Sequence, residues 1–297
     1  MFNKGATAVV CTSPHCFFLS IREEGIYSFI NGVWKFEYPL SFSIFHFRII
    51  GDYLFGVGDN GKIIRYNLKK QIWTEATFPT VQRLWDIAGN NHGLIVTHSG
   101  SQLLFSENFG KNWIVIKPFK KLQSKPIIRS LSIFENAIYI GTQIHKECGG
   151  LWKYCLLTKT LTRIKEEQSM MISAIYVDKE IMCIAKGACS SNNGCIEVYM
   201  NRNNQLIQWK NLHSPMKENA FLDIFFSKGN LYVCSSKGVN GYSTIYYCDV
   251  RKEELIPMET IRGHCYRAAY AYDELMLAGA EESKWIALKT KTEQKIH

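Results

Sequence analysis

Residues 86–116 read DIAGNNHGLIVTHSGSQLLFSENFGKNWIVI and contain one full example of the unit that decides the fold. A polar residue, Asp86, stands eight positions before the apolar residue Leu94. A strand led by Gly100 follows, and Trp113 opens another short strand. Short apolar segments separated by Gly, Asn and Asp turns predict β-strands, and nothing here reads as a long amphipathic helix. The stretch therefore predicts a small sheet of four strands.

The same unit recurs along the chain. Six anchor residues each stand eight positions before an apolar residue, namely His46, Asp86, Ser130, Ser173, Asp223 and Ala268. Successive anchors are 40 to 50 residues apart, and an equivalent first copy fits at residues 8–10. Such a period is typical of β-propeller blades, because one sheet with two apolar faces cannot bury both alone. The sequence predicts an all-β, seven-bladed propeller of four-stranded antiparallel blades, with six blades as the alternative.

We expect one propeller domain over residues 1–297. The expected blades span approximately residues 6–38, 42–78, 82–119, 126–166, 169–212, 219–259 and 263–297. The first and last copies match the unit least well, so strands from the two ends of the chain could combine to close the ring.

Composition limits the class of protein. The chain has 297 residues, of which 46% are hydrophobic, enough for a large core. No apolar run approaches the roughly 20 residues of a spanning helix, and the first residues lack a continuous signal-peptide core. We therefore expect a cytoplasmic protein without membrane association, whose cysteines (Cys183, Cys234 and Cys248 within apolar runs) are reduced. A secreted protein with five disulfides is the alternative.

The segment Ser106-Glu-Asn-Phe-Gly-Lys-Asn-Trp113 resembles the Asp-box, Ser/Thr-x-Asp-x-Gly-x-Thr-Trp. That motif marks sialidase-like (BNR) propellers and photosystem assembly propellers of the Ycf48 type. Asn108 replaces the Asp and Asn112 replaces the Thr, so this copy is degenerate. The resemblance implies a turn between the third and fourth strands of a blade. It implies architecture only and no activity.

Four arginines fall in or beside expected first strands, which line the axis of a propeller. They are Arg48, Arg83, Arg129 and Arg267. Guanidinium groups that converge there would bind an anion through charge-assisted hydrogen bonds. We therefore choose these four as ligand-binding candidates at the channel mouth, with salt links between blades and a sialidase-like arginine triad as alternatives.

His46, Asp86, Asp223 and His264 are the candidates for a catalytic cluster. The alternative is that these polar side chains satisfy backbone groups and channel water. The cysteine loop at 183–195, with His145 and Cys148 nearby in the preceding blade, could form a zinc site, but its gaps are wider than zinc sites usually show. We expect no metal and no cofactor.

The sequence favours a non-catalytic binding or scaffold propeller that holds a protein, a peptide or a small anionic ligand at the channel mouth. The excursions at 143–149, 186–194 and 235–243 are the expected specificity loops. The alternative is a propeller enzyme, a lyase, hydrolase or peptide-tailoring enzyme, with His46 or His264 as base. The net charge of +9 is spread along the chain without a basic block or an RNA-binding motif, so specific nucleic-acid binding is not favoured.

Overall fold

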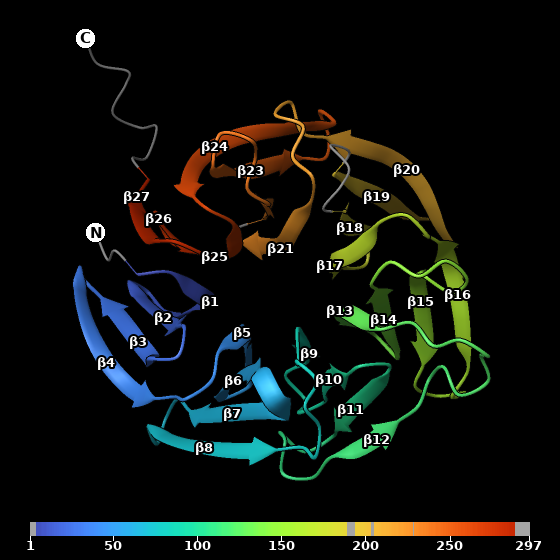
Figure 1. Ribbon diagram of the computed structural model, residues 1–297, viewed down its shortest axis with the longest axis horizontal. Coiled ribbons are helices and arrows are strands. Elements are labelled where there is room, and N and C mark those ends of the chain that lie inside the picture. Colours follow the sequence, from blue (N-terminus) through green and yellow to red (C-terminus); the bar gives the residue numbers. More distant parts are fainter. Residues whose placement is uncertain (1–3, 189–193, 203–204, 228, 289–297) are drawn as a thin grey trace.

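Seven small antiparallel sheets surround a central axis in the computed structural model (Figure 1). The structure describes residues 4–188, 194–202, 205–227 and 229–288. The chain is a seven-bladed β-propeller, which confirms the predicted fold and decides against six blades. No helix in these ranges is long and apolar enough to cross a membrane.

Each blade takes its strands consecutively from the chain, from the axis outward. Blade 1 contains β1 (Ala6–Ser13), β2 (Cys16–Ile21), β3 (Gly25–Ile30) and β4 (Val33–Pro39). Blade 2 contains β5 (Ile44–Ile50), β6 (Tyr53–Gly58), the 3-10 turn η1 (Asp59–Gly61), β7 (Lys62–Asn67) and β8 (Ile72–Thr77). Blade 3 contains β9 (Ile87–Gly89), β10 (Ile95–Ser99), β11 (Gln102–Ser106) and β12 (Ile114–Ile116). Blade 4 contains β13 (Ile128–Phe134), β14 (Ala137–Thr142), β15 (Gly150–Cys155) and β16 (Leu161–Glu166).

The second half of the ring follows the same order. Blade 5 contains β17 (Met171–Val177), β18 (Ile181–Gly187), β19 (Cys195–Arg202) and β20 (Gln205–His213). Blade 6 contains β21 (Phe221–Ser227), β22 (Asn230–Ser235), β23 (Tyr242–Asp249) and β24 (Glu254–Arg262). Blade 7 shows β25 (Cys265–Ala271), β26 (Glu274–Gly279) and β27 (Ser283–Ala287) within the described residues.

Burial falls from the middle of a blade to its rim. Every residue of β2 and β14 is buried, whereas most residues of β8 are exposed. A middle strand packs against neighbouring blades on both faces, so its sequence is apolar or small on both, as in CFFLSI and AIYIGT. Cys183, Cys234 and Cys248 are buried in such packing, as the sequence predicts.

Most inner strands contain a β-bulge near their start. The pairing register skips one residue in β1, β5, β13, β17, β21 and β25. The skipped residues are Thr7, Phe45, Arg129, Ser173, Leu222 and Tyr266. A bulge residue leaves the ladder and its side chain takes a new direction, and all of this set except Ser173 line the cavity at the channel mouth.

The bulges also correct two of the sequence anchors. The residues that follow the bulges in blades 5 and 7 are Ala174 and Arg267, not Ser173 and Ala268. The eight-residue spacing itself holds, since it leads from Ala174 to Met182 and from Arg267 to Leu275. The sequence count starts instead from the adjacent apolar residues Ile181 and Met276, which shifts each anchor by one position. Arg267 is therefore the equivalent of His46 and Asp223.

Hydroxyl groups on the inner strands join neighbouring blades. Thr7 donates a hydrogen bond to the carbonyl of Ile44 in blade 2. Ser130 donates to the carbonyl of Ile172 at 2.8 Å, and Ser173 donates to the carbonyl of Phe221. These bonds fix one blade against the next without occupying channel space.

Blade 1 and blade 7 close the ring by packing and not by a shared sheet. Phe17 and Leu19 share a core cluster with Met276 and Ala278, and the hydroxyl of Ser283 donates to the carbonyl of Lys4 at 2.9 Å. The inner strands β1 and β25 of these two blades lie side by side in Figure 1. The expectation of strands shared between the two ends is not met in the described residues, because β1–β4 alone complete blade 1.

The segment Ser106–Trp113 forms the turn between β11 and β12, the expected place in the blade. The Ser106 hydroxyl accepts the Gly110 N–H at 3.0 Å and donates to Asn108 Oδ1 at 3.1 Å. The Trp113 indole N–H donates to the Gly110 carbonyl at 3.1 Å. The turn therefore satisfies its own backbone groups.

Candidate binding site at the propeller channel

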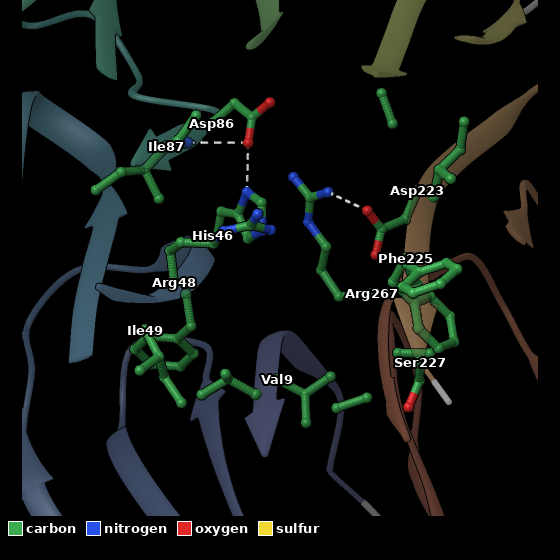
Figure 2. A pocket seen from close by; sticks show the side chains of 18 of the residues that line it. Val9, His46, Arg48, Ile49, Asp86, Ile87, Asp223, Phe225, Ser227 and Arg267 are labelled. Atoms are coloured by element: carbon green, nitrogen blue, oxygen red, sulfur yellow. Dashed lines mark hydrogen bonds and ion pairs between the residues drawn. The ribbon is translucent and has the colours of Figure 1, made fainter. Parts of the chain in front are cut away.

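Four ionisable side chains from four blades meet in the channel (Figure 2). They are His46 on β5, Asp86 directly before β9, Asp223 on β21 and Arg267 on β25, and we call them the plug. Arg267 Nη1 donates to Asp223 Oδ1 at 2.5 Å. Its other nitrogens reach the carbonyls of Phe45 at 3.3 Å and Trp85 at 3.4 Å. One guanidinium therefore ties blades 2, 3, 6 and 7 together.

Asp86 forms the other half of the plug. Its Oδ1 is hydrogen-bonded to His46 Nδ1 and accepts the Ile87 N–H at 2.9 Å. Its Oδ2 accepts the Leu131 N–H of blade 4 at 2.7 Å. Burial opposes ionisation of Asp86, but His46, Arg267 and this amide together lower its pKa to about 2. Asp86 is therefore a carboxylate and only accepts hydrogen bonds.

The two basic groups of the plug differ in charge. Burial, with the nearby charge of Arg267, lowers the pKa of His46 below its ordinary value, so the imidazole is neutral at neutral pH. Burial also opposes the charge of Arg267, but Asp223 and Asp86 outweigh it and raise the pKa of the guanidinium. The plug therefore holds one buried cation against two carboxylates and a neutral imidazole.

The plug divides the channel into two cavities, since Arg267 lines both. The cavity beside the starts of the inner strands has a volume of about 440 Å³, and we call it the mouth pocket. The cavity at the opposite end has a volume of about 400 Å³, and we call it the far cavity. Each is large enough for a side chain or a small molecule.

Aromatic rings and arginines form the wall of the mouth pocket. Its principal residues are Arg22, Phe45, Arg83, Trp85, Arg129 and Tyr266. Phe45, Arg129 and Tyr266 are bulge residues, so the pocket exists because the inner strands are irregular here.

Cations and rings alternate along this wall. The guanidinium of Arg129 lies 4.5 Å from the centre of the Trp85 ring. The Phe45 ring lies 4.6 Å beyond Trp85, and the Arg83 guanidinium lies 5.3 Å from Trp85 and 5.7 Å from Phe45. Cation–π contacts of this kind hold the guanidinium groups in place while leaving their N–H groups free to bind.

Arg129 lacks an anionic partner. No hydrogen bond or ion pair joins its guanidinium to another residue in the described part of the chain. Burial and the charge of Arg267, which Asp86 and Asp223 offset only in part, lower its pKa to about 10, and this still leaves it charged at neutral pH. Arg83, in contrast, pairs with Asp59 at 3.0 Å. The mouth pocket therefore presents a cation that has no direct ion pair among the described residues.

The structure places the predicted residues at four locations. Arg83, Arg129 and Arg267 line the mouth pocket together, but Arg48 lines the far cavity. His46, Asp86 and Asp223 meet with Arg267 in the plug. His264 lies outside both cavities, where it accepts the Lys237 N–H at 3.0 Å. Arg48 and His264 are therefore separated from the groups with which the sequence analysis placed them.

Sequence reasoning missed the rings of the mouth pocket. Phe45, Trp85 and Tyr266 each come directly before a polar plug residue, namely His46, Asp86 and Arg267. A large side chain one position before each polar anchor was a readable signal. Its meaning depends on the bulge, which turns neighbouring residues to different cavities and which spacing does not reveal.

The loops after second strands contact the start of the inner strand in their own blade. The N–H of Gln143 donates to the Ile127 carbonyl at 2.9 Å, and the N–H of Ser236 donates to the Ala220 carbonyl at 2.7 Å. The loops at 143–149 and 235–243 therefore lie on the face of the mouth pocket, whereas residues 189–193 of the third loop are outside the described residues. Within the described ranges no three His, Cys, Asp or Glu side chains are grouped as a metal would require.

Comparison with known proteins gives one clear relative. No family model matches the chain. The uncharacterized protein YkuO of Bacillus subtilis (strain 168) is 33% identical over 290 residues, which make up 96% of this chain and 97% of that protein.

Solved structures share the fold at low identity. A chain of the mitotic checkpoint complex superposes with a TM-score of 0.73 at 10% identity, covering 98% of this chain and 93% of its own length. YCF48 from Cyanidioschyzon merolae gives 0.66 at 14% identity, covering 94% of each chain. The extracellular domain of the putative one component system BT4673 from B. thetaiotaomicron gives 0.69 at 14% identity over 96% of this chain, which spans 38% of that domain. These likenesses show the fold alone.

Proposed function

The chain belongs to the same family as YkuO of Bacillus subtilis, and we propose that it is a binding propeller whose mouth pocket holds an acidic segment of a protein partner. The observation that supports this most is Arg129, a charged group in a pocket of about 440 Å³ whose guanidinium forms no ion pair with any described residue. Leaving a partly buried cation unpaired costs free energy that a ligand carboxylate would recover. Selection for stability alone would favour an apolar residue at this position.

The surroundings of Arg129 favour a peptide over a bare ion. Phe45, Trp85 and Tyr266 offer apolar area, and the ring of Trp85 fixes one face of the guanidinium. An acidic side chain would bind the fork of Arg129, while an adjacent apolar or aromatic side chain would lie on the rings. The loops at 143–149 and 235–243 stand on the same face and would contact the rest of the partner. The presence of this fold in the mitotic checkpoint complex, a protein assembly, supports a protein as the partner.

Selection of short random peptides displayed on phage tests the proposal. The wild-type protein is immobilised, and soluble Arg129→Met protein is added in excess as a competitor. We expect the surviving peptides to be enriched in Asp or Glu beside an aromatic residue. Peptides without acidic enrichment, or acidic peptides that the competitor removes, would refute the role of Arg129. Arg251→Met serves as the matched competitor, because Arg251 is an exposed arginine that does not line the mouth pocket.

A further inference from the structure

The far cavity contains a hydrogen-bonding group that the proposed function does not use. His46 and Arg48 line it together with Asp86, Asp223 and Phe225 (Figure 2). It lies on the opposite side of Arg267 from the mouth pocket. A ligand here would leave the mouth pocket open to its own partner.

The hydrogen bonds of Asp86 fix which nitrogen of His46 carries the proton. Asp86 is ionised, and both of its oxygens already accept backbone N–H groups. The His46 nitrogen that faces this carboxylate, Nδ1, must therefore donate. In a neutral imidazole the other nitrogen, Nε2, then has a free lone pair.

Nε2 of His46 is open to the cavity. No hydrogen bond joins it to any residue that the structure describes, and the side chain keeps 16% of its surface exposed. The plug thus presents an oriented hydrogen-bond acceptor to a cavity of about 400 Å³. Two backbone N–H groups hold Asp86, and Asp86 in turn fixes the orientation of the His46 ring. A histidine that only fills space would not need its ring orientation fixed in this way.

Arg48 supplies a cation beside this acceptor. It stands two residues after His46 on the regular part of β5, so the two Cα atoms are roughly 7 Å apart and the side chains share one face. Among the described residues no hydrogen bond or ion pair occupies its guanidinium. A cation and a neutral acceptor at this spacing complement a small molecule with an anion and a donor on neighbouring atoms.

We propose that the far cavity is a second binding site, for a small carboxylate that carries an O–H or N–H donor on the adjacent carbon. The carboxylate binds the fork of Arg48, and the donor bonds to Nε2 of His46. Arg267 remains paired with Asp223 and closes the site toward the mouth pocket.

Nuclear magnetic resonance of protein labelled at its histidine rings tests this site. The probes are malate, aspartate and succinate, which share one carbon skeleton and differ in having an O–H, an N–H or neither beside a carboxylate. The His46 signal is assigned with His46→Gln. We expect malate, aspartate or both to shift it saturably below about 10 mM, and succinate to bind at least about tenfold more weakly.

Two variants separate this site from the mouth pocket. Arg48→Met, at an exposed position, should abolish the shift without lowering the melting temperature. Arg129→Met should leave it unchanged, because Arg129 lies on the other side of the plug. If malate shifts the His46 signal at lower concentration than succinate does, the natural ligand carries an O–H donor. If only aspartate saturates the shift, the natural ligand carries an N–H donor. Equal binding of succinate, no shift with any probe, or an unaltered shift in Arg48→Met would overturn the proposal.

Discussion

The plug and the mouth pocket are built from neighbouring residues of the inner strands, yet their charged side chains have different partners. In the plug, Arg267 faces Asp223 and His46 faces Asp86. In the mouth pocket, Arg129 packs on the ring of Trp85 and forms no ion pair with a described residue. A paired charge holds blades together, whereas an unpaired one costs stability until a ligand arrives. A shift of one residue along an inner strand therefore separates a structural role from a binding role.

The largest expected effect comes from breaking the plug. Arg267→Met keeps most of the side-chain volume but leaves the Asp223 carboxylate buried and unpaired. The free energy of unfolding should fall by about 3–5 kcal/mol, measured by urea denaturation. Adding Asp223→Leu to this variant removes the unpaired carboxylate and should restore most of the lost unfolding free energy. If the unfolding free energy of Arg267→Met were within about 1 kcal/mol of the wild-type value, the structural role of the plug would be contradicted.

The next effect concerns His98, which lies behind the mouth pocket and accepts the Trp85 N–H at 3.3 Å. Burial lowers the pKa of His98 to about 3. Above pH 6.5 the imidazole is neutral in both states and titration has no effect on stability. Between pH 6.5 and 3 the unfolded chain binds a proton at His98 that the folded chain excludes. The free energy of unfolding therefore decreases as the pH is lowered through this range.

His98→Gln removes this contribution. The unfolding free energy of wild type should fall relative to that of the variant by up to about 1.4 kcal/mol per pH unit as the pH is lowered from about 6.5 to about 4. Parallel pH profiles for the two proteins would show that His98 is accessible to protons. Denaturation at a series of pH values makes the comparison.

A smaller effect is expected at the outer wall of the mouth pocket. The Arg83–Asp59 pair is exposed, with 58% of the Arg83 side chain accessible. Arg83→Ala should lower the unfolding free energy by less than about 1 kcal/mol, because solvent screens such pairs. Thermal denaturation measures the change. A loss as large as that of Arg267→Met would erase the distinction between the two regions.

The smallest effect on stability should come from Arg129→Met. Since the guanidinium has no direct ion pair to lose among the described residues, the unfolding free energy should stay within about 1 kcal/mol of wild type or increase. Urea denaturation without ligand checks this. A loss of several kcal/mol would show that Arg129 is structural and would remove the main support for the proposed function.

The blade period could be predicted from the sequence, because apolar strands and Gly-led turns repeat with local spacing. The common level of His46, Asp86 and Asp223 in the channel also follows from their equivalent anchors, but the contact through Arg267 that brings Asp223 to the other two does not. The partition of arginines could not be predicted, since Arg48 and Arg129 both lie on inner strands and only the bulge at Arg129 turns it toward the mouth. Bulges depend on packing between blades, which residue spacing does not encode.

Calorimetric titration of the best selected acidic peptide into wild type and Arg129→Met, at about 0.05 and about 0.3 M salt, tests the binding role of Arg129. We expect saturable binding to wild type that weakens at the higher salt. The affinity of Arg129→Met should be roughly 10- to 100-fold lower, which corresponds to the free energy of a hydrogen bond to a charged group. Equal affinity of the two proteins for the peptide would contradict a binding role for the unpaired arginine of the mouth pocket.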